Sequence, residues 1–501
     1  MKSAVRMYPD CIHESARYRV PIPYPGSVTL RVVRTPPDAY IRHRNRTGSS
    51  TYTLYVNAIR TCGWGGFDRR RFAAASTHTG RTFMLNRIKE TIDSGLSRRR
   101  FLTGALAAGA ALTLADRLAL AQTMASGGLT AKDIHGIGVE PGLVRMALNE
   151  NPIGPSPRAL EAIAEQMFNI NRYSFGGGDI YGALAEFDGM ELPPPPRFGG
   201  TGRMGGGGRF FRQTPFYITA GSGALLSQIA LTYLSKGGTE VIEADMGYGD
   251  ISGDAENYQQ FAGLDVNIIR TPMKDYTHDL DAMLAAITPK TSVVVITNPN
   301  NPTGTLLSFE ETEKFVAAVP ENVLVVIDEA YIHFVRDPQY RTAASLATKY
   351  DNVIVTRTFS KVFGMPGMRL GYGICSQAIQ QKLRFYRTGS ANALAYAAGE
   401  ASLKDRNHYN RSRAVVQHFR DRLEEEFTKM GLEYIPSESN FMMVDLGKPS
   451  MNIMREMFRK GVMVTNRRRQ QMPTWIRVSS GDERETEVFL NVLKEALGKT
   501  S

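Results

Sequence analysis

Lys361 lies in the stretch of the sequence best placed for covalent chemistry. The run VIVTRTFSKVFGMPGMRLGYG puts it just beyond a short β-branched segment, with Thr358 and Ser360 before it and Arg369 eight positions after it. A lysine amine can form an imine with a carbonyl compound and then serve as a covalent anchor. Lys361 is therefore a candidate for binding a carbonyl cofactor.

Other polar motifs meet the further needs of one such cofactor, pyridoxal phosphate (PLP). PLP chemistry requires a lysine amine, an acid facing the pyridine nitrogen, donors to the ring oxygen and a cradle for the phosphate. The motifs TNPNNPTGT at 297–305, DEAYIHF at 328–334 and the glycine turn in YITAGSGALLSQIAL at 217–231 each lie at or beyond an apolar run. The carboxyl ends of strands in an open parallel sheet converge on one crevice, so we expect these motifs to meet there.

The elements that must carry these motifs alternate along the chain. β-branched runs lie at 293–297, 323–327 and 353–356, and helical segments such as SFEETEKFVAAV separate them. Strands that are apolar on both faces and linked by helices are typical of a parallel α/β sheet. After about residue 383 longer helices are followed by the short runs FMMVDLG, GVMVT and TWIRVS, which predict a second, smaller α+β domain.

The order of these motifs resembles that of the fold-type-I, class I and II aminotransferases, and most closely the branch similar to histidinol-phosphate aminotransferase. The resemblance runs from about Leu148 to Phe489. It implies an α/β large domain with a mostly parallel sheet flanked by helices, a smaller α+β C-terminal domain, and PLP as the cofactor. It also implies a small-molecule amino donor, a 2-oxo acid acceptor and a homodimer.

The resemblance gives Lys361 and its neighbours their roles. In the family motif S-K-x-F-x-x-x-G-x-R, the lysine holds PLP as a Schiff base and the arginine grips the phosphate. Lys361 and Arg369 match those two positions, and Thr358 and Ser360 match the hydroxyl groups that join the phosphate. Lys361 would also be the general acid–base catalyst that moves a proton during transamination.

The same resemblance assigns the contacts to the cofactor ring. Asn301 matches the last asparagine of the N-P-x-N-P-T-G loop, and it would bind the ring oxygen together with Tyr331. Asp328 would pair with the pyridinium nitrogen and keep it protonated. Tyr248, in EADMGYGDI, takes the place of the aromatic residue that stacks on the ring, although the two residues before it are not the usual Pro-Thr.

The phosphate has two further expected contacts. The strand, turn and helix expected at 217–231 would point the backbone N–H groups of Ser222, Gly223 and Ala224 at the phosphate, although family members often carry an acid where Ala224 stands. The segments LNENPIGPSP and NRYSF resemble the arm that crosses to a neighbouring subunit. Tyr173 would then reach the phosphate bound by the other protomer.

The substrate contacts lie at the two ends of the resemblance. TWIRVSSG resembles the arginine motif that binds the substrate α-carboxylate, which assigns Arg477 to a bidentate pair. Asn149 and Asn301 would also face the substrate. In the histidinol-phosphate branch an arginine commonly follows the G-[VI]-x-[VI] run and helps to bind a substrate phosphate, but Thr465 stands there and the arginines begin only at Arg467. A broad α-amino acid aminotransferase is thus as good an interpretation as a histidinol-phosphate enzyme.

The positive charge of the chain is concentrated near its start. The formal net charge is +11, but residues 1–83 hold about 14 Lys and Arg against about 4 Asp and Glu. The remainder is near neutral, so we expect no nucleic-acid partner. The three cysteines show no metal-ligand spacing, and we expect no metal.

Residues 97–121, SRRRFLTGALAAGAALTLADRLALA, predict an export signal. An arginine cluster precedes an apolar stretch too short to span a bilayer, and its start resembles the twin-arginine motif. We therefore expect a periplasmic or otherwise exported protein without a stable membrane anchor. Because such a signal works at an N-terminus, we expect translation to start at Met84. Residues 1–83, which show no sustained helical or strand period, would then be upstream sequence or a disordered basic extension.

These expectations divide the chain into five parts and one insert. The parts are the extension 1–83, the signal 84–121, an N-terminal arm 122–172, the large PLP-binding domain 173–385 and the small domain 386–501. The insert, at 188–213, is rich in proline and glycine and predicts a surface loop within the large domain.

Two other functions fit parts of the sequence. A PLP-dependent decarboxylase or lyase on the same fold would share every cofactor residue named above. A secreted, non-catalytic PLP-binding protein belongs to a different class, and it would have no need of a substrate clamp at Arg477.

Overall fold

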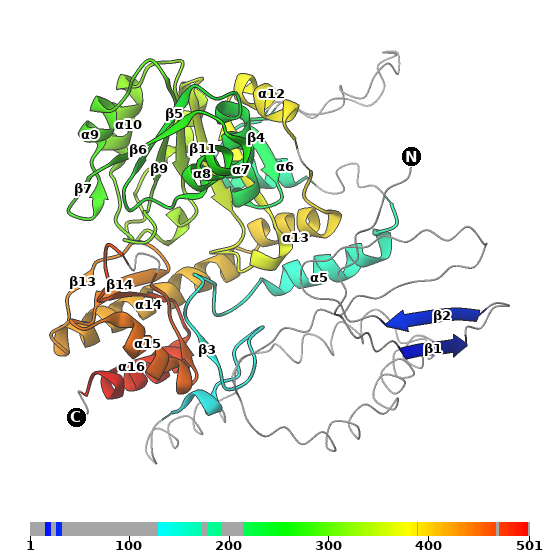
Figure 1. Cartoon of the computed structure of the whole chain (residues 1–501), viewed down its shortest axis with the longest axis vertical. Coiled ribbons are helices and arrows are strands. Elements are labelled where there is room, and N and C mark those ends of the chain that lie inside the picture. Colours follow the sequence, from blue (N-terminus) through cyan, green and yellow to red (C-terminus); the bar gives the residue numbers. More distant parts are fainter. Residues whose placement is uncertain are drawn as a thin grey trace, which may run out of the picture. The chain divides into compact units, whose positions relative to one another are not determined.

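The computed structural model describes most of the chain after its first quarter. The described residues are 16–21, 27–32, 129–172, 179–192, 214–387, 389–466 and 470–498. The chain divides into two compact units, Met1–Leu96 and Ser97–Ser501, which we describe separately (Figure 1). The predicted export signal and most of the predicted insert lie outside the described residues.

The first unit contains a small antiparallel sheet. Its strands are β1 (Ala16–Pro21) and β2 (Ser27–Val32), with Tyr18 opposite Leu30. This differs from the expectation that residues 1–83 lack a strand period. Both six-residue segments do alternate apolar and polar residues, which is the pattern of a strand with two unlike faces.

Seven strands form the sheet of the large domain, in the order β4-β12-β11-β10-β9-β5-β6. Their bounds are β4 (Phe216–Thr219), β5 (Thr239–Ala244), β6 (Val266–Thr271), β9 (Thr291–Thr297), β10 (Leu324–Asp328), β11 (Val353–Thr358) and β12 (Gly371–Cys375). Only β12 runs against its neighbours, β11 and β4, and the other pairs are parallel. The predicted mostly parallel α/β sheet is confirmed.

Alternate residues of the central strands serve opposite sides of this sheet. In β10, Val325 and Ile327 pack into the core on one side, whereas Leu324 and Val326 pack into the core on the other. Successive side chains of a strand point to opposite faces, so a strand covered on both faces must be apolar throughout. This requirement explains the continuous apolar runs of the sequence.

Helices cover both faces of the sheet (Figure 1). One layer contains α7 (Ser222–Leu234), α8 (Asp250–Ala262) and α12 (Gln377–Phe385). The other contains α6 (Ile180–Asp188), α9 (Leu280–Ala285), α10 (Phe309–Ala318), α11 (Leu346–Lys349) and α13 (Ala393–Lys404). α10 begins with a capping box, in which Ser308 Oγ accepts the N–H of Glu311 at 3.2 Å and Glu311 Oε2 accepts the N–H of Ser308 at 2.8 Å.

The small domain is built on a three-stranded antiparallel sheet. Its strands, in the order β13-β14-β16, are β13 (Tyr434–Ile435), β14 (Phe441–Asp445) and β16 (Trp475–Ser479). Its helices are α14 (Arg406–Lys429), α15 (Ser450–Arg459) and α16 (Glu483–Leu497). One face of the sheet, with Met442, Val444, Ile476 and Val478, packs into the core formed with these helices. The structure thus contains the second α+β core that the sequence predicted.

The segment predicted as an N-terminal arm, 122–172, is partly built into the small domain. β3 (Val144–Arg145) pairs in parallel with β15 (Val462–Met463), and Ile134 and Met146 lie in the small-domain core. This pairing connects residues far apart in the sequence, and no local sequence pattern predicts it.

The border between the two cores also differs from the predicted one at residue 386. Ala395 and Ala398 of α13 lie in the large-domain core. The long helix α14 then joins the cores, with Val416 in the large-domain core and Phe419 in the small-domain core.

The remaining described elements are short. They are α5 (Pro157–Gln166), β7 (Met273–Lys274), β8 (Thr277–His278) and the 3-10 helices Ala131–Asp133, Met167–Asn169, Ile332–Phe334, Ala343–Ser345 and Pro366–Met368. In the part of the chain that the structure describes, none of the helices has the length and apolar character needed to cross a membrane.

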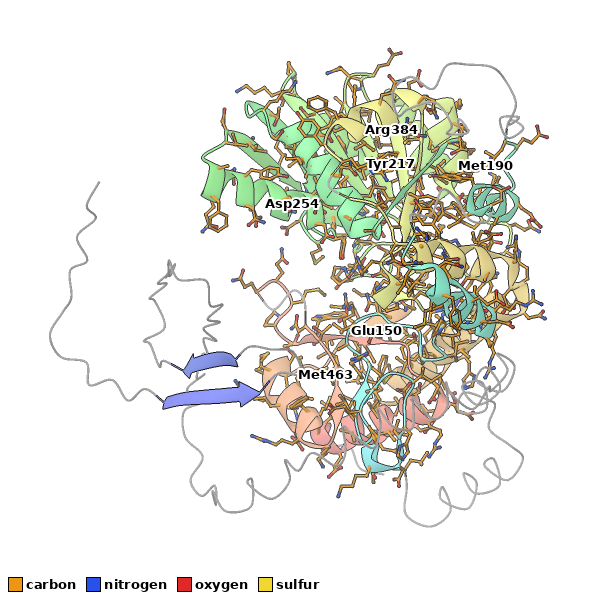
Figure 2. The ribbon with its side chains drawn as sticks, turned by 90° about the vertical axis from the view of Figure 1, so that its right-hand side faces the viewer. Glu150, Met190, Tyr217, Asp254, Arg384 and Met463 are labelled. Atoms are coloured by element: carbon orange, nitrogen blue, oxygen red, sulfur yellow. The ribbon has the colours of Figure 1, made fainter. Side chains whose placement is uncertain are left out.

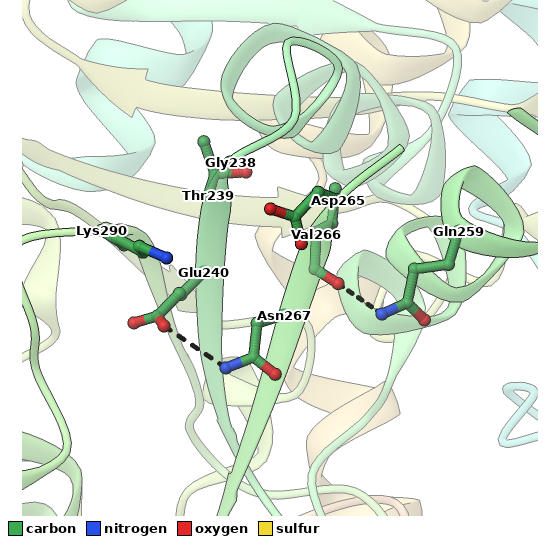
Figure 3. Close-up of a pocket in the computed structure, with 8 residues that line it drawn as sticks. All are labelled: Gly238, Thr239, Glu240, Gln259, Asp265, Val266, Asn267 and Lys290. Carbon is green, nitrogen blue, oxygen red and sulfur yellow. Dashed lines mark hydrogen bonds between the residues drawn. The ribbon is translucent and has the colours of Figure 1, made fainter. Parts of the chain in front are cut away.

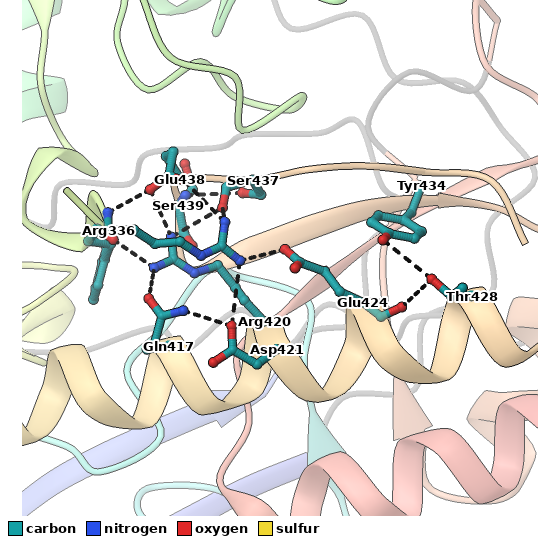
Figure 4. A network of polar contacts seen from close by, with 11 residues as sticks. Arg336, Gln417, Arg420, Asp421, Glu424, Thr428, Tyr434, Ser437, Glu438 and Ser439 are labelled. Carbon is teal, nitrogen blue, oxygen red and sulfur yellow. Dashed lines mark hydrogen bonds and ion pairs between the residues drawn. The ribbon is translucent and has the colours of Figure 1, made fainter.

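Polar contacts fix the small domain against the large one (Figure 4). Arg336 of the large domain donates from Nη1 to the carbonyl oxygen of Ser437 at 3.1 Å and forms ion pairs with Glu424 and with Glu438, the latter at 3.1 Å. The N–H of Glu438 donates to the carbonyl oxygen of Gly304 at 2.8 Å. A loop of the small domain therefore rests on the turn that follows β9.

Candidate active site

Loops at the carboxyl ends of four strands carry the residues predicted to bind the cofactor. Asp328 is the last residue of β10, whereas Asn301, Lys361 and Ser222 follow β9, β11 and β4. These four strands run in the same direction, so their carboxyl ends meet at one edge of the sheet. The structure thus brings together motifs that are far apart in the sequence.

Tyr331 is the centre of a buried hydrogen-bond network. Its hydroxyl oxygen accepts from Asn149 Nδ2 at 2.9 Å and from Asn301 Nδ2 at 3.2 Å. Its ring meets that of Phe441 edge-on, with 5.0 Å between the centroids. Because both acceptor positions of the oxygen are used, the hydroxyl proton must point to a third partner. Tyr331 can therefore donate a hydrogen bond to a bound ligand.

The amine of Lys361 lies beside this network. Lys361 Nζ donates to the carbonyl oxygens of Asn149 at 3.1 Å and of Leu148 at 3.4 Å, and it lies 5.5 Å from the centroid of the Tyr331 ring. Glu150, the next residue of that segment, lies where the large and small domains meet (Figure 2). The amine is therefore placed at the boundary of the two domains.

Asp328 is a buried carboxyl group, only 3 % exposed. Burial raises the pKa of Asp328 to about 7, against a hydrogen bond from Thr356 that lowers it, and the negative charge of Asp250 adds to the rise. Thr356 Oγ1 donates to Asp328 Oδ1 at 2.8 Å. A nearby cation would restore the ionised form, so this site suits a positively charged ring nitrogen.

The start of α7 forms a cradle for an anion. Gly221, at φ 96°, is the N-cap of the helix and has no side chain with which to cap the first backbone N–H groups. The guanidinium of Arg369 packs so closely on Gly221 that a Cβ atom there would clash with Nη2. Thr358 pairs with Gly371 of β12, which in turn pairs with Thr219 at the end of β4. The predicted phosphate contacts therefore lie on adjacent strand ends.

The hydroxyl groups before Lys361 are bonded to each other. Thr358 Oγ1 donates to Ser360 Oγ at 3.0 Å and accepts the N–H of Ser360 at 3.1 Å, and both residues are buried. These bonds hold the two hydroxyls at the same strand end as Lys361.

Tyr248 lies in the loop between β5 and α8, with its ring partly buried against the core that contains α7. Glu243, 1 % exposed, fixes this loop from the strand. Its Oε1 accepts the N–H of Gly249 at 2.8 Å and its Oε2 accepts from Ser252 Oγ at 2.5 Å. Glu243 was not among the predicted residues, because a lone acid inside an apolar strand does not indicate its partners.

An acidic side chain stands near α7 even though Ala224 does not supply one. Asp250 Oδ2 lies 3.7 Å from the position that a Cβ atom would take on Gly223. The acid comes from the first residue of α8, two positions after Tyr248, instead of from the glycine turn itself.

Arg477 lies in β16 with its guanidinium turned toward the large domain. Nη1 donates to Asn301 Oδ1 at 2.6 Å and Nη2 donates to the carbonyl oxygen of Ala147 at 3.1 Å. The guanidinium carbon lies 5.2 Å from the centroid of the Phe441 ring. Asn301 therefore joins Arg477 to Tyr331, which places the predicted carboxylate-binding group next to the residues predicted to bind the cofactor.

Two residues of the small domain belong to the site and were not predicted. Ser479 Oγ and Asn440 Nδ2 both bind Asn149, the first at 2.9 Å to Oδ1 and the second at 3.1 Å to the carbonyl oxygen. Ser479 follows Arg477 by two positions, so the period of a strand puts it on the same face. That spacing was the signal available in the sequence.

Some predicted residues lie outside the described part of the chain. Tyr173 and the arginines 467–469 are among them. Among the described residues, no group of three His, Cys, Asp or Glu side chains is placed to hold a metal ion.

A separate hollow of about 290 Å³ lies at the amino ends of β5 and β6, away from Lys361 (Figure 3). Glu240 on its wall is engaged by Asn267 at 3.3 Å and by Thr288 at 2.5 Å. This hollow is no part of the site at the carboxyl ends of the strands.

The family model described as aminotransferase class I and II matches residues 209–493. The chain belongs to the aminotransferase class I and II family. Histidinol-phosphate aminotransferase of Moorella thermoacetica is 35 % identical over 71 % of this chain and 86 % of its own length. That of Akkermansia muciniphila is 36 % identical over 72 % of this chain and 92 % of its own length.

Solved structures of the same family agree. A putative histidinol-phosphate aminotransferase from Erwinia carotovora atroseptica has a TM-score of 0.62 at 27 % identity, covering 72 % of this chain and 97 % of that one. Histidinol-phosphate aminotransferase from Sinorhizobium meliloti, solved in complex with pyridoxal-5'-phosphate, has a TM-score of 0.62 at 26 % identity, covering 72 % and 92 %. The predicted PLP fold type I is confirmed, and the cofactor of this enzyme is PLP.

The residues present fit that cofactor. The glycine turn leaves room for Arg369 beside the start of α7, as a phosphate site requires. The raised pKa of Asp328 marks a carboxyl group suited to a cationic partner. Tyr331 has a hydroxyl proton to donate, and Lys361 Nζ lies next to it.

Proposed function

We propose that this enzyme, a PLP-dependent aminotransferase, moves an amino group between an amino acid, or a histidinol-phosphate-like amine, and a 2-oxo acid, with Lys361 as its catalytic residue. The observation that carries the proposal is the hydrogen-bonded chain from Arg477 through Asn301 to Tyr331 beside Lys361. It unites a group suited to a substrate carboxylate with groups suited to the cofactor.

Lys361 has two tasks in this proposal. PLP, when bound, supplies a carbonyl that condenses with amines and a ring that takes up the electrons of the bond broken at the substrate Cα. Lys361 Nζ would hold the cofactor until a substrate amine takes its place. The freed amine of Lys361 would then move a proton between the substrate Cα and the carbon that came from the carbonyl. The carbonyl oxygen of Asn149, 3.1 Å from Nζ, orients the free amine of Lys361.

The other residues bind and orient. Asp328 would keep the ring nitrogen protonated, and Tyr331 with Asn301 would donate to the ring oxygen. The ring of Tyr248 would stack on the ring of the cofactor. The phosphate contacts are Ser222, Gly223 and Ala224 through their backbone N–H groups, the hydroxyls of Thr358 and Ser360, the guanidinium of Arg369, and Tyr173 of a second copy.

Arg477 binds the substrate α-carboxylate, and Asn149 lies beside it. A planar guanidinium matches a carboxylate with two parallel hydrogen bonds. Asn301 Oδ1 and the carbonyl oxygen of Ala147, which accept from the two terminal nitrogens of Arg477, are neutral groups, and an anionic carboxylate is a stronger acceptor than either.

The choice of substrate rests on the residue at position 465. Relatives named histidinol-phosphate aminotransferase are 35–36 % identical to this chain, yet Thr465 stands where that branch commonly carries an arginine. A broad α-amino acid aminotransferase is therefore proposed alongside the histidinol-phosphate enzyme. A half-reaction screen over amino donors, with histidinol phosphate included, separates them. Reaction with histidinol phosphate and with only one amino acid, the one formed from the 2-oxo acid acceptor, would refute the broad specificity.

A decarboxylase is the alternative function that has to be distinguished from an aminotransferase by experiment. L-threonine-O-3-phosphate decarboxylase of Porphyromonas gingivalis has a TM-score of 0.56 at 18 % identity, which shows a shared fold and no more. Measuring 2-oxo acid and carbon dioxide in the same half-reaction decides between the two. Transamination yields the 2-oxo acid without carbon dioxide.

We also propose a homodimer in which each copy completes the site of the other. Among the described residues, most large hydrophobic side chains with high exposure lie in one segment: Ile137, Leu148, Leu160, Met167, Phe168 and Ile170. Exposed apolar side chains gathered in one segment are typical of an interface. The segment leads directly to Tyr173, the residue expected to reach the second site.

Mixing two variants, Lys361→Ala, which should be inactive, and Tyr173→Phe, which should be impaired, tests this arrangement. In a hybrid dimer of Lys361→Ala and Tyr173→Phe chains, one of the two sites keeps Lys361 from one copy and Tyr173 from the other. We therefore expect partial recovery of activity after the variants are unfolded together and refolded. If both residues served the same copy's site, mixing would recover nothing.

Finally, we propose export by the twin-arginine route with translation from Met84. The support is the arginine cluster and short apolar stretch at 97–121. The protein made from Met84 should reach the periplasm with full activity, and changing the consecutive arginines to lysines should retain it in the cytoplasm. Peptides from residues 1–83 in the mature protein, detected by mass spectrometry, would contradict the start site.

A further inference from the structure

Ser479 makes two hydrogen bonds to a single residue of the site. It ends β16, two positions after Arg477, and is 1 % exposed. Its Oγ accepts the backbone N–H of Asn149 at 2.8 Å and donates to Asn149 Oδ1 at 2.9 Å. One hydroxyl therefore fixes both the backbone and the side-chain amide of Asn149.

The backbone of Asn149 needs such support. Its φ is 54°, in the left-handed region that residues other than glycine seldom adopt. Its carbonyl oxygen is held by Asn440 Nδ2 at 3.1 Å and by Lys361 Nζ at 3.1 Å. Ser479 and Asn440 of the small domain therefore bind the N–H and the carbonyl oxygen of Asn149, respectively.

The direction of the Asn149 amide decides what Tyr331 encounters. Because Oδ1 is bound by Ser479, Nδ2 faces the Tyr331 hydroxyl oxygen, at 2.9 Å. An amide turned the other way would present an acceptor, and Tyr331 would then donate its proton to Asn149. Ser479 favours the first orientation because its Oγ already accepts the Asn149 N–H and its single proton has Asn149 Oδ1 as the acceptor, which a turned amide would take away.

We propose that Ser479 is a positioning residue that keeps Asn149 a hydrogen-bond donor to Tyr331 and so keeps the Tyr331 proton available for the ring oxygen of PLP. This inference rests on the proposed role of Tyr331 at that oxygen. Two donors on the Tyr331 oxygen polarise its O–H bond and make it a stronger donor. A stronger hydrogen bond from Tyr331 would stabilise negative charge on the ring oxygen and so lower the pH at which the visible band of the PLP-loaded protein titrates.

The test is a pH titration of the visible absorption band of the PLP-loaded protein. Ser479→Ala should raise the midpoint by roughly half to one pH unit, the size that loss of one net hydrogen bond gives. Asn149→Gly, which tolerates the left-handed backbone and lacks the amide, should raise it similarly. Ser480→Ala is the matched control. Ser480 is 4 % exposed and donates to the carbonyl oxygen of Glu150 at 3.3 Å, so its loss should leave the midpoint unchanged.

A double variant shows whether Ser479 acts through Asn149. The protein with both Ser479→Ala and Asn149→Gly should titrate like Asn149→Gly alone, because the two changes break one path. Additive shifts would overturn the proposal, as would an unshifted midpoint in Ser479→Ala. If Ser479→Ala does not fold, Ser479→Thr and Ser479→Val make the same comparison, since they share a shape and only Thr keeps the hydroxyl.

The same titration separates this proposal from the proposed function. A native protein that gains no visible band with PLP would overturn both. A normal visible band whose titration midpoint is the same in the native protein and in Ser479→Ala would overturn only the positioning role of Ser479.

Discussion

Replacing Arg477 with alanine should disable the substrate contact and spare the cofactor. Arg477 is 3 % exposed, and its terminal nitrogens donate to Asn301 Oδ1 at 2.6 Å and to the carbonyl oxygen of Ala147 at 3.1 Å. Truncation removes a charge-assisted pair and leaves the substrate charge unpaired in a buried site, a loss of about 2–5 kcal/mol. That corresponds to a fall on the order of 30- to several-thousand-fold in kcat/KM.

Two measurements keep substrate and cofactor effects apart. Single-turnover rates over a range of amino donor concentrations report the substrate contact, and the visible absorbance reports PLP occupancy. Arg477→Ala and Arg477→Lys should both keep normal occupancy, with only partial rescue by lysine because a point charge cannot reproduce the planar fork. Arg369→Ala should show the opposite pattern, with reduced occupancy. The reasoning is refuted if Arg477→Ala loses PLP but handles amino acids normally in excess PLP, which would move the clamp to arginines 467–469.

Three other changes have definite expected outcomes. Gly221→Ala should weaken PLP binding to the apoenzyme at least about tenfold by displacing Arg369. Gly223→Ala is the control and should bind PLP normally, because its Cβ would meet nothing nearer than 3.7 Å. Equal PLP affinities of the two variants would contradict the proposed phosphate site at the start of α7. Asp328→Asn should keep the cofactor but slow amino transfer on the order of 30- to several-thousand-fold, because a neutral amide does not stabilise a protonated ring nitrogen. An unchanged single-turnover rate would refute the pairing of Asp328 with the ring nitrogen. Burial raises the pKa of Glu485 from 4.5 to about 7, so the stability that its protonated form gives is present below pH 4.5 and lost as pH rises through 7. Glu485→Gln should therefore increase the free energy of unfolding at pH 8 by about 1–3 kcal/mol more than it does at pH 5. A change in thermal stability that is the same at both pH values would contradict the raised pKa of Glu485.

The positions of the residues predicted to bind the cofactor could be expected from the sequence because they depend on one rule. Asp328, Asn301 and Lys361 each end or follow a continuous apolar run, and parallel strands carry such positions to the same edge. The apolar runs themselves were readable because both faces of the sheet are covered by helices.

The contacts made by the small domain could not be read in the same way. The bonds from Ser479 to Asn149 join residues 330 positions apart, and they depend on how β16 meets the segment after β3. The pairing of β3 with β15 is likewise a two-residue contact without a local pattern. Such contacts follow from the docking of one domain on the other, which periodicity does not encode.

Adding one amino donor to the PLP-loaded protein, with no acceptor present, tests the role of Lys361 most directly. We predict that the visible band gives way to the spectrum of pyridoxamine phosphate and that one equivalent of 2-oxo acid appears per site, without carbon dioxide. Lys361→Ala should lack the band and the product while its circular dichroism stays that of the native protein. A Lys361→Ala protein that keeps both the band and the activity would contradict the assignment of Lys361.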